Sequence, residues 1–469
     1  MKICQGWVKK LSDVKTLEME RQQIFIDLFR GNVPSRIPVK NPLAFDAIVE
    51  YSNLNLAEVY WDMTRAEEAF DKVCQEFFSD VLPGSNTQRS PSFYQLLGSK
   101  SFVMASNGVM QHPNVEGMLP EDYDEFIASP YDCIIEKILP RLYTELDTED
   151  PNIKSLTLAK AMRAYGDETE TFGALSAKLR ARYGYASIPG GQTEAPYDFL
   201  ADCFRSFTGI SKDIRRIPDK VVAACEAVMP LLIKKGRLPA PSDFGMTLIP
   251  LHMAPYMRLK DFEKFYWPTL KKQVEALTEM GINVLLFLEN DWMRYLDYLY
   301  ELPENTILRF EYGDPKIVKD KLGKKHIISG FYPISLLHEG TKEQCIDKAK
   351  ELLDILAPGG KYWFDFDKSV LDLHGNIVEN LKSVLQYVYE NGRYSESERL
   401  GNTQRLGRVD NTDRIISEID KNIKSKYFTT WEKYKEKHSE LEDRPESVIS
   451  EKIKKYEDLM FNFIISLCL

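Results

Sequence analysis

The sequence predicts an α/β protein built as a (β/α)8 TIM barrel, with an N-terminal helical segment and a C-terminal helical extension. Helices and short apolar strands alternate through the middle of the chain, which indicates a parallel sheet covered by helices. About eight strand candidates lie between residues 37 and 366, a number that suits a barrel with insertions. The chain has neither a G-x-G-x-x-G turn nor a G-x-x-x-x-G-K-[ST] loop, so a nucleotide-binding open sheet is disfavoured.

The strand candidates become clearer along the chain. The first three candidates are weak, because their apolar runs are short and are interrupted by polar residues. These candidates are 36–40, 57–62 and 100–108. Each later candidate follows a helical pattern or a glycine turn and is richer in strand-forming residues. These are 181–193, 245–253, 282–290, 306–314, 326–333 and 361–369.

Helix boundaries between these strands are marked by capping residues. Apolar residues at helical spacing over 261–280 end at Gly281, and an apolar strand follows at once. Further on, Thr341 and Gln344 fit a capping box, and the double glycine at 359–360 ends the helix that they begin. These signals predict repeated units of helix, turn and buried strand.

Composition excludes several classes of function. With 469 residues, of which 43% are hydrophobic, the chain can bury a large core. A formal net charge of -10 argues against general binding to nucleic acid or to an anionic membrane. We expect a cytoplasmic protein with free thiols, because no apolar run reaches the roughly 18 residues of a membrane span and the cysteines form no C-x-x-C pair.

Polar and aromatic residues stand at the carboxyl ends of the predicted strands. A barrel carries its chemistry at these ends, so we expect the side chains to point into a common mouth. The residues concerned are Gln192, Thr193, Glu194, His252, Glu289, Trp292, Glu311, Asp314, Tyr332, Asp365 and Asp367.

Seven segments together resemble the uroporphyrinogen decarboxylase superfamily, whose members are (β/α)8 barrels. They are 29–39, 77–84, 190–210, 250–272, 330–345, 356–367 and 380–394. The resemblance implies a barrel with N-terminal helices over 1–394. It does not extend over 395–469, where dense charge and apolar residues at helical spacing predict amphipathic helices that pack on the barrel or on a partner.

The superfamily includes the decarboxylase and corrinoid-dependent methyltransferases. Asp80 matches the segment that holds the catalytic aspartate of the decarboxylase, which makes it a catalytic candidate. The arginine-bearing run of the decarboxylase is replaced here by 40–53, which has no arginine. A porphyrinogen carries many carboxylates, and an acidic mouth would repel them. The strand at 326–333 also lacks the His-x-Cys pair that resembling thiol methyltransferases use to bind zinc.

What remains resembles enzymes that pass a methyl group from a small donor, such as an aromatic methyl ether, to the cobalt of a separate corrinoid protein. The leaving oxygen must then be protonated or bound to a Lewis acid. Two arrangements are open. His252, Glu289 and Glu311 can bind zinc, or a clustered carboxyl group such as Glu289 or Asp365 can donate the proton because its neighbours raise its pKa.

The other residues at the mouth are expected to bind the substrate. They are Gln192, Thr193, Glu194, Trp292 and Tyr332. Purely structural roles stay open, since His252 can be a hydrogen-bonded loop residue and Glu289 can cap the following helix. A decarboxylase and a non-catalytic corrinoid- or ligand-binding barrel are the alternative functions, and a homodimer is compatible with the composition.

Overall fold

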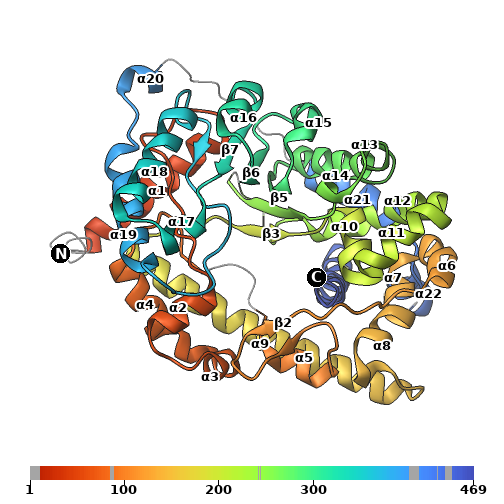
Figure 1. The fold of residues 1–469 in the computed structure, drawn as a ribbon. Helices are drawn as coiled ribbons and strands as arrows, with labels where there is room; N and C mark the ends of the chain where they lie inside the picture. The colour runs from red at the N-terminus through yellow and green to blue at the C-terminus, as the bar shows by residue number, and fades with distance from the viewer. Residues whose placement is uncertain are drawn as a thin grey trace.

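The computed structural model describes residues 11–84, 89–240, 242, 244–400, 411–429, 431–438 and 446–469 (Figure 1). A six-stranded sheet lies at its centre, and the strands follow one another in chain order. All five neighbouring pairs are parallel. The strands are β3 (Gly190–Gln192), β4 (Met246–Leu251), β5 (Asn283–Asp291), β6 (Ile307–Tyr312), β7 (Ile327–Gly330) and β8 (Tyr362–Trp363).

Helices surround this sheet and also form a separate N-terminal layer (Figure 1). The N-terminal helices are α1 (Leu11–Phe29), α2 (Phe45–Tyr51), α3 (Leu56–Trp61), α4 (Ala66–Glu76), α5 (Pro91–Leu97), α6 (Tyr123–Ala128), α7 (Pro130–Cys133), α8 (Leu139–Leu142) and α9 (Pro151–Tyr183). The helices between and after the strands are α10 (Pro196–Asp198), α11 (Ser206–Arg216), α12 (Pro218–Lys235), α13 (Leu259–Asp261), α14 (Trp267–Glu279), α15 (Leu296–Glu301), α16 (Pro315–Leu322), α17 (Ile334–Glu339), α18 (Lys342–Leu356) and α19 (Ile377–Asn391).

Short 3-10 and π-helical turns join several of these elements. They are η2 (Met63–Arg65), η3 (Pro120–Asp122), η4 (Ile134–Ile138), η5 (Thr144–Leu146), η6 (Phe199–Arg205), η7 (Ala254–Tyr256), η8 (Phe262–Tyr266) and η9 (Met293–Tyr295). Three of the turns, η4, η6 and η8, are π-helical. Because π-helical turns are rare and often lie at functional sites, η6 is relevant to the site described below.

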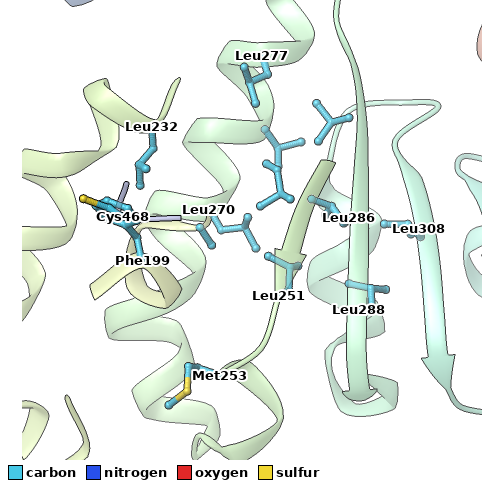
Figure 2. Packing of buried hydrophobic residues seen from close by; sticks show 14 of the residues in the cluster. Phe199, Leu232, Leu251, Met253, Leu270, Leu277, Leu286, Leu288, Leu308 and Cys468 are labelled. Atoms are coloured by element: carbon cyan, nitrogen blue, oxygen red, sulfur yellow. The ribbon is translucent and has the colours of Figure 1, made fainter. Parts of the chain in front are cut away.

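The two faces of the sheet pack against different apolar clusters. On one face Leu286, Leu288 and Leu308 meet leucines of α14 in the large core (Figure 2). On the other face Leu285 and Ile307 belong to a smaller cluster with four apolar residues of α1. Strands that are apolar on both faces are typical of a parallel sheet with helices on each side.

The sheet does not close on itself. Between β8 and β3, two chain segments make isolated backbone hydrogen bonds instead of continuous ladders. The Phe364 N–H donates to the Pro38 carbonyl. Lys40 N–H donates to the Phe364 carbonyl, Asp80 N–H donates to the Val39 carbonyl, and Ala186 N–H donates to the Asp80 carbonyl. The predicted α/β class and parallel sheet are therefore confirmed, whereas closure into an eight-stranded barrel is not.

Two of the weak strand predictions were wrong. Residues 57–62 lie mostly in α3, whose start is capped because the Asn55 side chain accepts the Glu58 N–H. Residues 100–108 contribute only β1 (Val103–Met104), which pairs antiparallel with β2 (Met110–Gln111) outside the main sheet. In both places a local cap or turn prevailed over a short apolar run.

The capping signals were read correctly. Gly281 follows α14 with a φ of 79°, a conformation that favours glycine. Thr341 and Gln344 form the predicted capping box at the start of α18. The helix ends before the double glycine, where Gly359 and Gly360 both have positive φ.

The C-terminal extension packs on the same core. Its helices are α20 (Glu396–Leu400), α21 (Thr412–Asn422), α22 (Trp431–Lys437) and α23 (Glu446–Ser466). Lys234 of α12 forms ion pairs with Asp420 and Asp458 at 2.7 and 3.0 Å. Cys468, just after α23, lies beside Phe199 in the core (Figure 2). The predicted amphipathic helices thus contact the α/β unit directly.

The described cysteines are all free thiols, in line with the absence of C-x-x-C pairs. Cys4 lies outside the described residues. None of the described helices has the length and apolar character needed to cross a lipid bilayer.

Asp80 is fully buried and is bound by two arginines. Arg36 donates from Nη1 and Nη2 to both carboxylate oxygens at 2.7 Å, and Arg21 Nε lies 3.4 Å from Oδ1. The Val39 N–H also donates to Oδ2 at 2.8 Å. Both guanidinium groups lie over the Phe78 ring, each 5.6 Å from its centroid. These contacts join α1 to the two chain segments that lie between β8 and β3, and they favour a structural role for the predicted catalytic Asp80.

We expect Asp80→Asn to lower the free energy of unfolding by about 3–5 kcal/mol, because it leaves two buried arginines without a counter-charge. Urea unfolding followed by circular dichroism measures the loss. Asp219 is 94% exposed and pairs with Lys264 at 3.2 Å, so Asp219→Asn is the matched control. It should cost less than about 1 kcal/mol. Equal effects of the two substitutions would contradict the structural role of Asp80.

Candidate active site

Glu289 stands where β5 bends. The ladder between β5 and β6 shifts its register between Leu288 and Asp291, and Asn290 has a φ of 61°. The Asn290 N–H leaves the ladder and donates to Glu311 Oε2 at 2.8 Å. Because bulges redirect side chains near the ends of strands, this irregularity sets the direction of the Glu289 carboxyl group.

His252 lies in the loop after β4 and contacts two carboxyl groups. Its Nδ1 is 3.4 Å from Glu289 Oε2 and 3.7 Å from Asp202 Oδ2. The side chain is 38% exposed, so it also reaches solvent. Two residues predicted from the sequence, His252 and Glu289, are thus neighbours, and they meet a third residue that was not predicted.

Asp198 holds the loop that carries His252. Its buried carboxylate accepts the backbone N–H groups of His252 and Met253 at 3.1 and 3.0 Å, and the Tyr266 hydroxyl donates to it as well. Asp198 ends α10, and the π-helical turn η6 follows directly and carries Asp202. The spacing of four residues, which places both aspartates on one helical side, was the available sequence signal and was missed.

Glu194 is a buried acid that forms no ion pair with any described cation. It follows β3, and no described group forms a hydrogen bond with its Oε2. Burial raises the pKa of Glu194 well above its ordinary value of 4.5, and the nearby Asp198 and Asp202 raise it further. Burial therefore favours the protonated form of Glu194.

The other acids of the cluster follow the same rule. Burial raises the pKa of Asp198 to about 7 and also raises the pKa values of Asp202 and Glu289. For His252, burial alone would lower the pKa, but Asp198, Glu289 and Asp202 together raise it. The cluster thus binds protons more readily than the same groups would in water, beside a His252 side chain that reaches solvent. We call Glu194, Asp198, Asp202, His252 and Glu289 the proton cluster.

Glu311 lies at the edge of this cluster, but both of its carboxylate oxygens already have partners. Lys368 Nζ is 2.7 Å from Oε1, and the Asn290 N–H donates to Oε2. Within the described ranges, no group of three or more His, Cys, Asp or Glu side chains is placed to hold a metal ion. The geometry of His252, Glu289 and Glu311 therefore does not fit the zinc site predicted from the sequence.

Asp365 lies apart from the proton cluster, between two cations. Its Oδ2 is 3.3 Å from Arg309 Nε and 3.6 Å from Lys40 Nζ. The Phe366 N–H donates to its Oδ1 at 2.8 Å. Lys40 and Arg309 were not singled out from the sequence, because each stands inside an apolar strand pattern.

Three predicted substrate-binding residues are core residues. Thr193 donates to the Leu232 carbonyl at 2.8 Å, and the Tyr332 hydroxyl donates to the Cys345 carbonyl at 2.9 Å. Trp292 is fully buried and donates to the Glu289 carbonyl at 3.1 Å. They support the site from behind. Gln192, at the end of β3, is half-buried, and Glu194 belongs to the proton cluster described above.

No family model and no curated protein sequence matches this chain. Among solved structures, a methyltransferase from Methanosarcina mazei has a similar fold, with a TM-score of 0.52 and 13% sequence identity. The match covers 79% of this chain and 98% of that one. At this identity the likeness shows the fold alone. The resemblance of the motifs to the uroporphyrinogen decarboxylase superfamily stays a prediction.

The proton on Glu194 predicts a pH-dependent stability. At a pH above 4.5, the ordinary pKa of a glutamate, this carboxyl group is ionised in the unfolded protein. In the folded protein its raised pKa favours the protonated form. Wild-type stability therefore falls as the pH rises, by at most about 1.4 kcal/mol per pH unit from this group. Glu194→Gln removes the titration, so the stability of the variant relative to wild type should rise between about pH 5 and about pH 8.

Urea unfolding at both pH values tests this expectation. The exposed Glu226→Gln, on α12, is the control and should change the two stabilities by equal amounts. A difference between Glu194→Gln and wild type that stays constant with pH would mean that Glu194 is ionised in the folded protein.

Proposed function

We propose that this protein is a methyltransferase that moves a methyl group from a small methylated donor, such as an aromatic methyl ether, to the cobalt of a corrinoid protein. Three observations support the proposal. The fold is similar to that of a solved methyltransferase over nearly the whole length of that chain. The sequence motifs resemble the corrinoid-dependent branch of a superfamily. The proton cluster supplies what such a transfer requires of the protein.

The observation that carries the proposal is the position of His252 between Glu289 and Asp202. Both acids lie on the Nδ1 side of the ring. Within the described part of the chain, Nε2 makes no hydrogen bond, and the side chain is partly exposed. A protonated His252 can therefore direct its Nε2–H toward a bound oxygen, while the acids behind it stabilise the imidazolium.

The transfer replaces the carbon–oxygen bond of the donor with a carbon–cobalt bond. Reduced cobalt on the partner supplies an electron pair that forms the new bond to the methyl carbon. The carbon–oxygen bond of the donor breaks, and its electron pair stays on the oxygen. The Nε2–H of His252 gives its proton to that oxygen, which leaves as an alcohol or a phenol. His252 then takes a new proton from solvent, which reaches its partly exposed side chain, and Glu289 and Asp202 again stabilise the imidazolium.

His252→Gln should slow the transfer from an aryl methyl ether by a factor of about 100 to 10,000, because general acid catalysis contributes roughly that much. The assay uses free cob(I)alamin as the acceptor and follows methyl-cobalt formation by absorbance. The loss should be smaller with 4-nitrophenyl methyl ether, whose leaving group needs less protonation.

His374→Gln, on a ring that is 81% exposed and pairs with Asp372, is the matched control and should retain activity. An equal loss of rate with both donors would show that His252 does not donate the proton. Conversion of uroporphyrinogen to coproporphyrinogen, with no methyl transfer, would overturn the proposal in favour of the decarboxylase.

Removal of metal distinguishes proton donation by His252 from activation of the leaving oxygen by zinc. Because the donor set does not fit a zinc site, we expect the transfer rate to be unchanged after dialysis against 1,10-phenanthroline. Metal analysis of the untreated protein should find far less than one zinc per chain. About one zinc per chain, lost together with activity in His252→Gln, would instead support the zinc arrangement.

A further inference from the structure

Solvent reaches the face of the sheet that leads to the proton cluster. Along β4, Met246, Leu248 and Pro250 are partly exposed, whereas the alternate residues are buried. Along β5, Phe287 and Glu289 repeat this pattern. Since side chains two residues apart share one face of a strand, these residues line one largely apolar wall that ends at Glu289.

Two cations lie on this wall, deeper than the proton cluster. Phe287 and Arg309 are register neighbours on β5 and β6, and each precedes an acid of the mouth by two residues. The Arg309 guanidinium lies over the Phe287 ring, 4.4 Å from its centroid. Arg309 and Lys40 share Asp365 at 3.3 and 3.6 Å. Two residues of strand place this group about 7 Å below the acids.

The positive charge of this group is only partly compensated. Two cations face one carboxylate, and Asp365 is the only acid within 4 Å of Lys40 in the described chain. The Lys40 side chain is 22% exposed, and burial lowers the pKa of its ammonium group, whereas Asp365 raises it. Arg309 also donates from Nε and Nη2 to the Phe366 carbonyl at 3.1 and 2.9 Å. Ser329, the register neighbour of Arg309 on β7, adds a buried hydroxyl that lacks a hydrogen-bond partner among the described residues.

We infer that Lys40 and Arg309 form an anion-binding subsite that holds a carboxylate of the methyl donor. This inference rests on the proposed function and narrows its substrate class to small organic acids that carry a methyl group. A carboxylate would balance the excess positive charge with charge-assisted hydrogen bonds. The apolar wall between the subsite and the proton cluster would contact the hydrocarbon part of the donor.

The acids of the mouth do not prevent anion binding. Burial favours the uncharged form of Glu194, and Lys368 pairs with Glu311 at 2.7 Å. Glu289 and His252 pair with each other at 3.4 Å. An anionic donor can therefore pass the rim without meeting a full set of negative charges.

Benzoate tests the subsite without any methyl transfer, because it has a carboxylate and no methyl group. Wild-type protein should bind benzoate more tightly than the neutral benzamide in isothermal titration calorimetry. Lys40→Met should weaken benzoate binding by about tenfold or more, as expected for loss of a charged hydrogen bond, and Lys40→Arg should retain it. Lys361→Met, on a lysine paired with Glu304 before β8, is the matched control and should leave the affinity unchanged.

Asp365→Asn should have the opposite effect. This substitution removes the carboxylate that competes with benzoate for the two cations. Benzoate should therefore bind the variant more tightly than it binds the wild type. It should also raise the melting temperature of the variant by more than that of the wild type. A merely structural role of Asp365 would not predict tighter binding. Equal affinities for benzoate and benzamide, or benzoate binding unaffected by Lys40→Met, would overturn the inference. Benzoate binding with no transfer from any methylated donor would instead reject the proposed function alone.

Discussion

The candidate site depends on one buried carboxyl group, that of Asp198. It accepts two consecutive backbone N–H groups from the loop after β4 and a third hydrogen bond from Tyr266. These bonds place His252 where the bulge after β5 directs Glu289. Three separate parts of the chain therefore meet because a single acid satisfies loop donors that burial would otherwise leave unpaired.

Burial has opposite consequences for acids with and without cations. Asp80 and Glu194 are both buried, but two arginines pair with Asp80, whereas no described cation lies within ion-pair distance of Glu194. The first acid therefore joins chain segments, whereas burial favours the protonated form of the second. The protein thus separates structural acids on the N-terminal side of the fold from proton-holding acids at the carboxyl ends of β3 to β5, and the difference lies in the neighbours rather than in the residue type.

The sequence predicted the elements whose signals are local. Strands β4 to β8 and the capping box at Thr341 follow from apolar runs and caps. The meeting of His252 with Glu289 could also be expected, because parallel strands end at one edge. Asp198 is marked only by its spacing from Asp202, and Lys40 and Arg309 could not be found in this way. Their significance depends on partners that lie 54, 325 and 57 residues away, and residue type alone does not reveal those contacts.

The charges along the apolar wall of β4 and β5 change with depth. Lys40 and Arg309 lie below an apolar wall, and the proton cluster lies above it. For the proposed reaction this order would orient an anionic donor, since its carboxylate is attracted inward and its leaving oxygen remains near His252. The methyl group would then face the mouth, the side from which a partner as large as a corrinoid protein must approach. In that proposal, the pairing of Glu289 with His252 and of Glu311 with Lys368 also matters, because unpaired negative charge at the rim would repel an anionic donor.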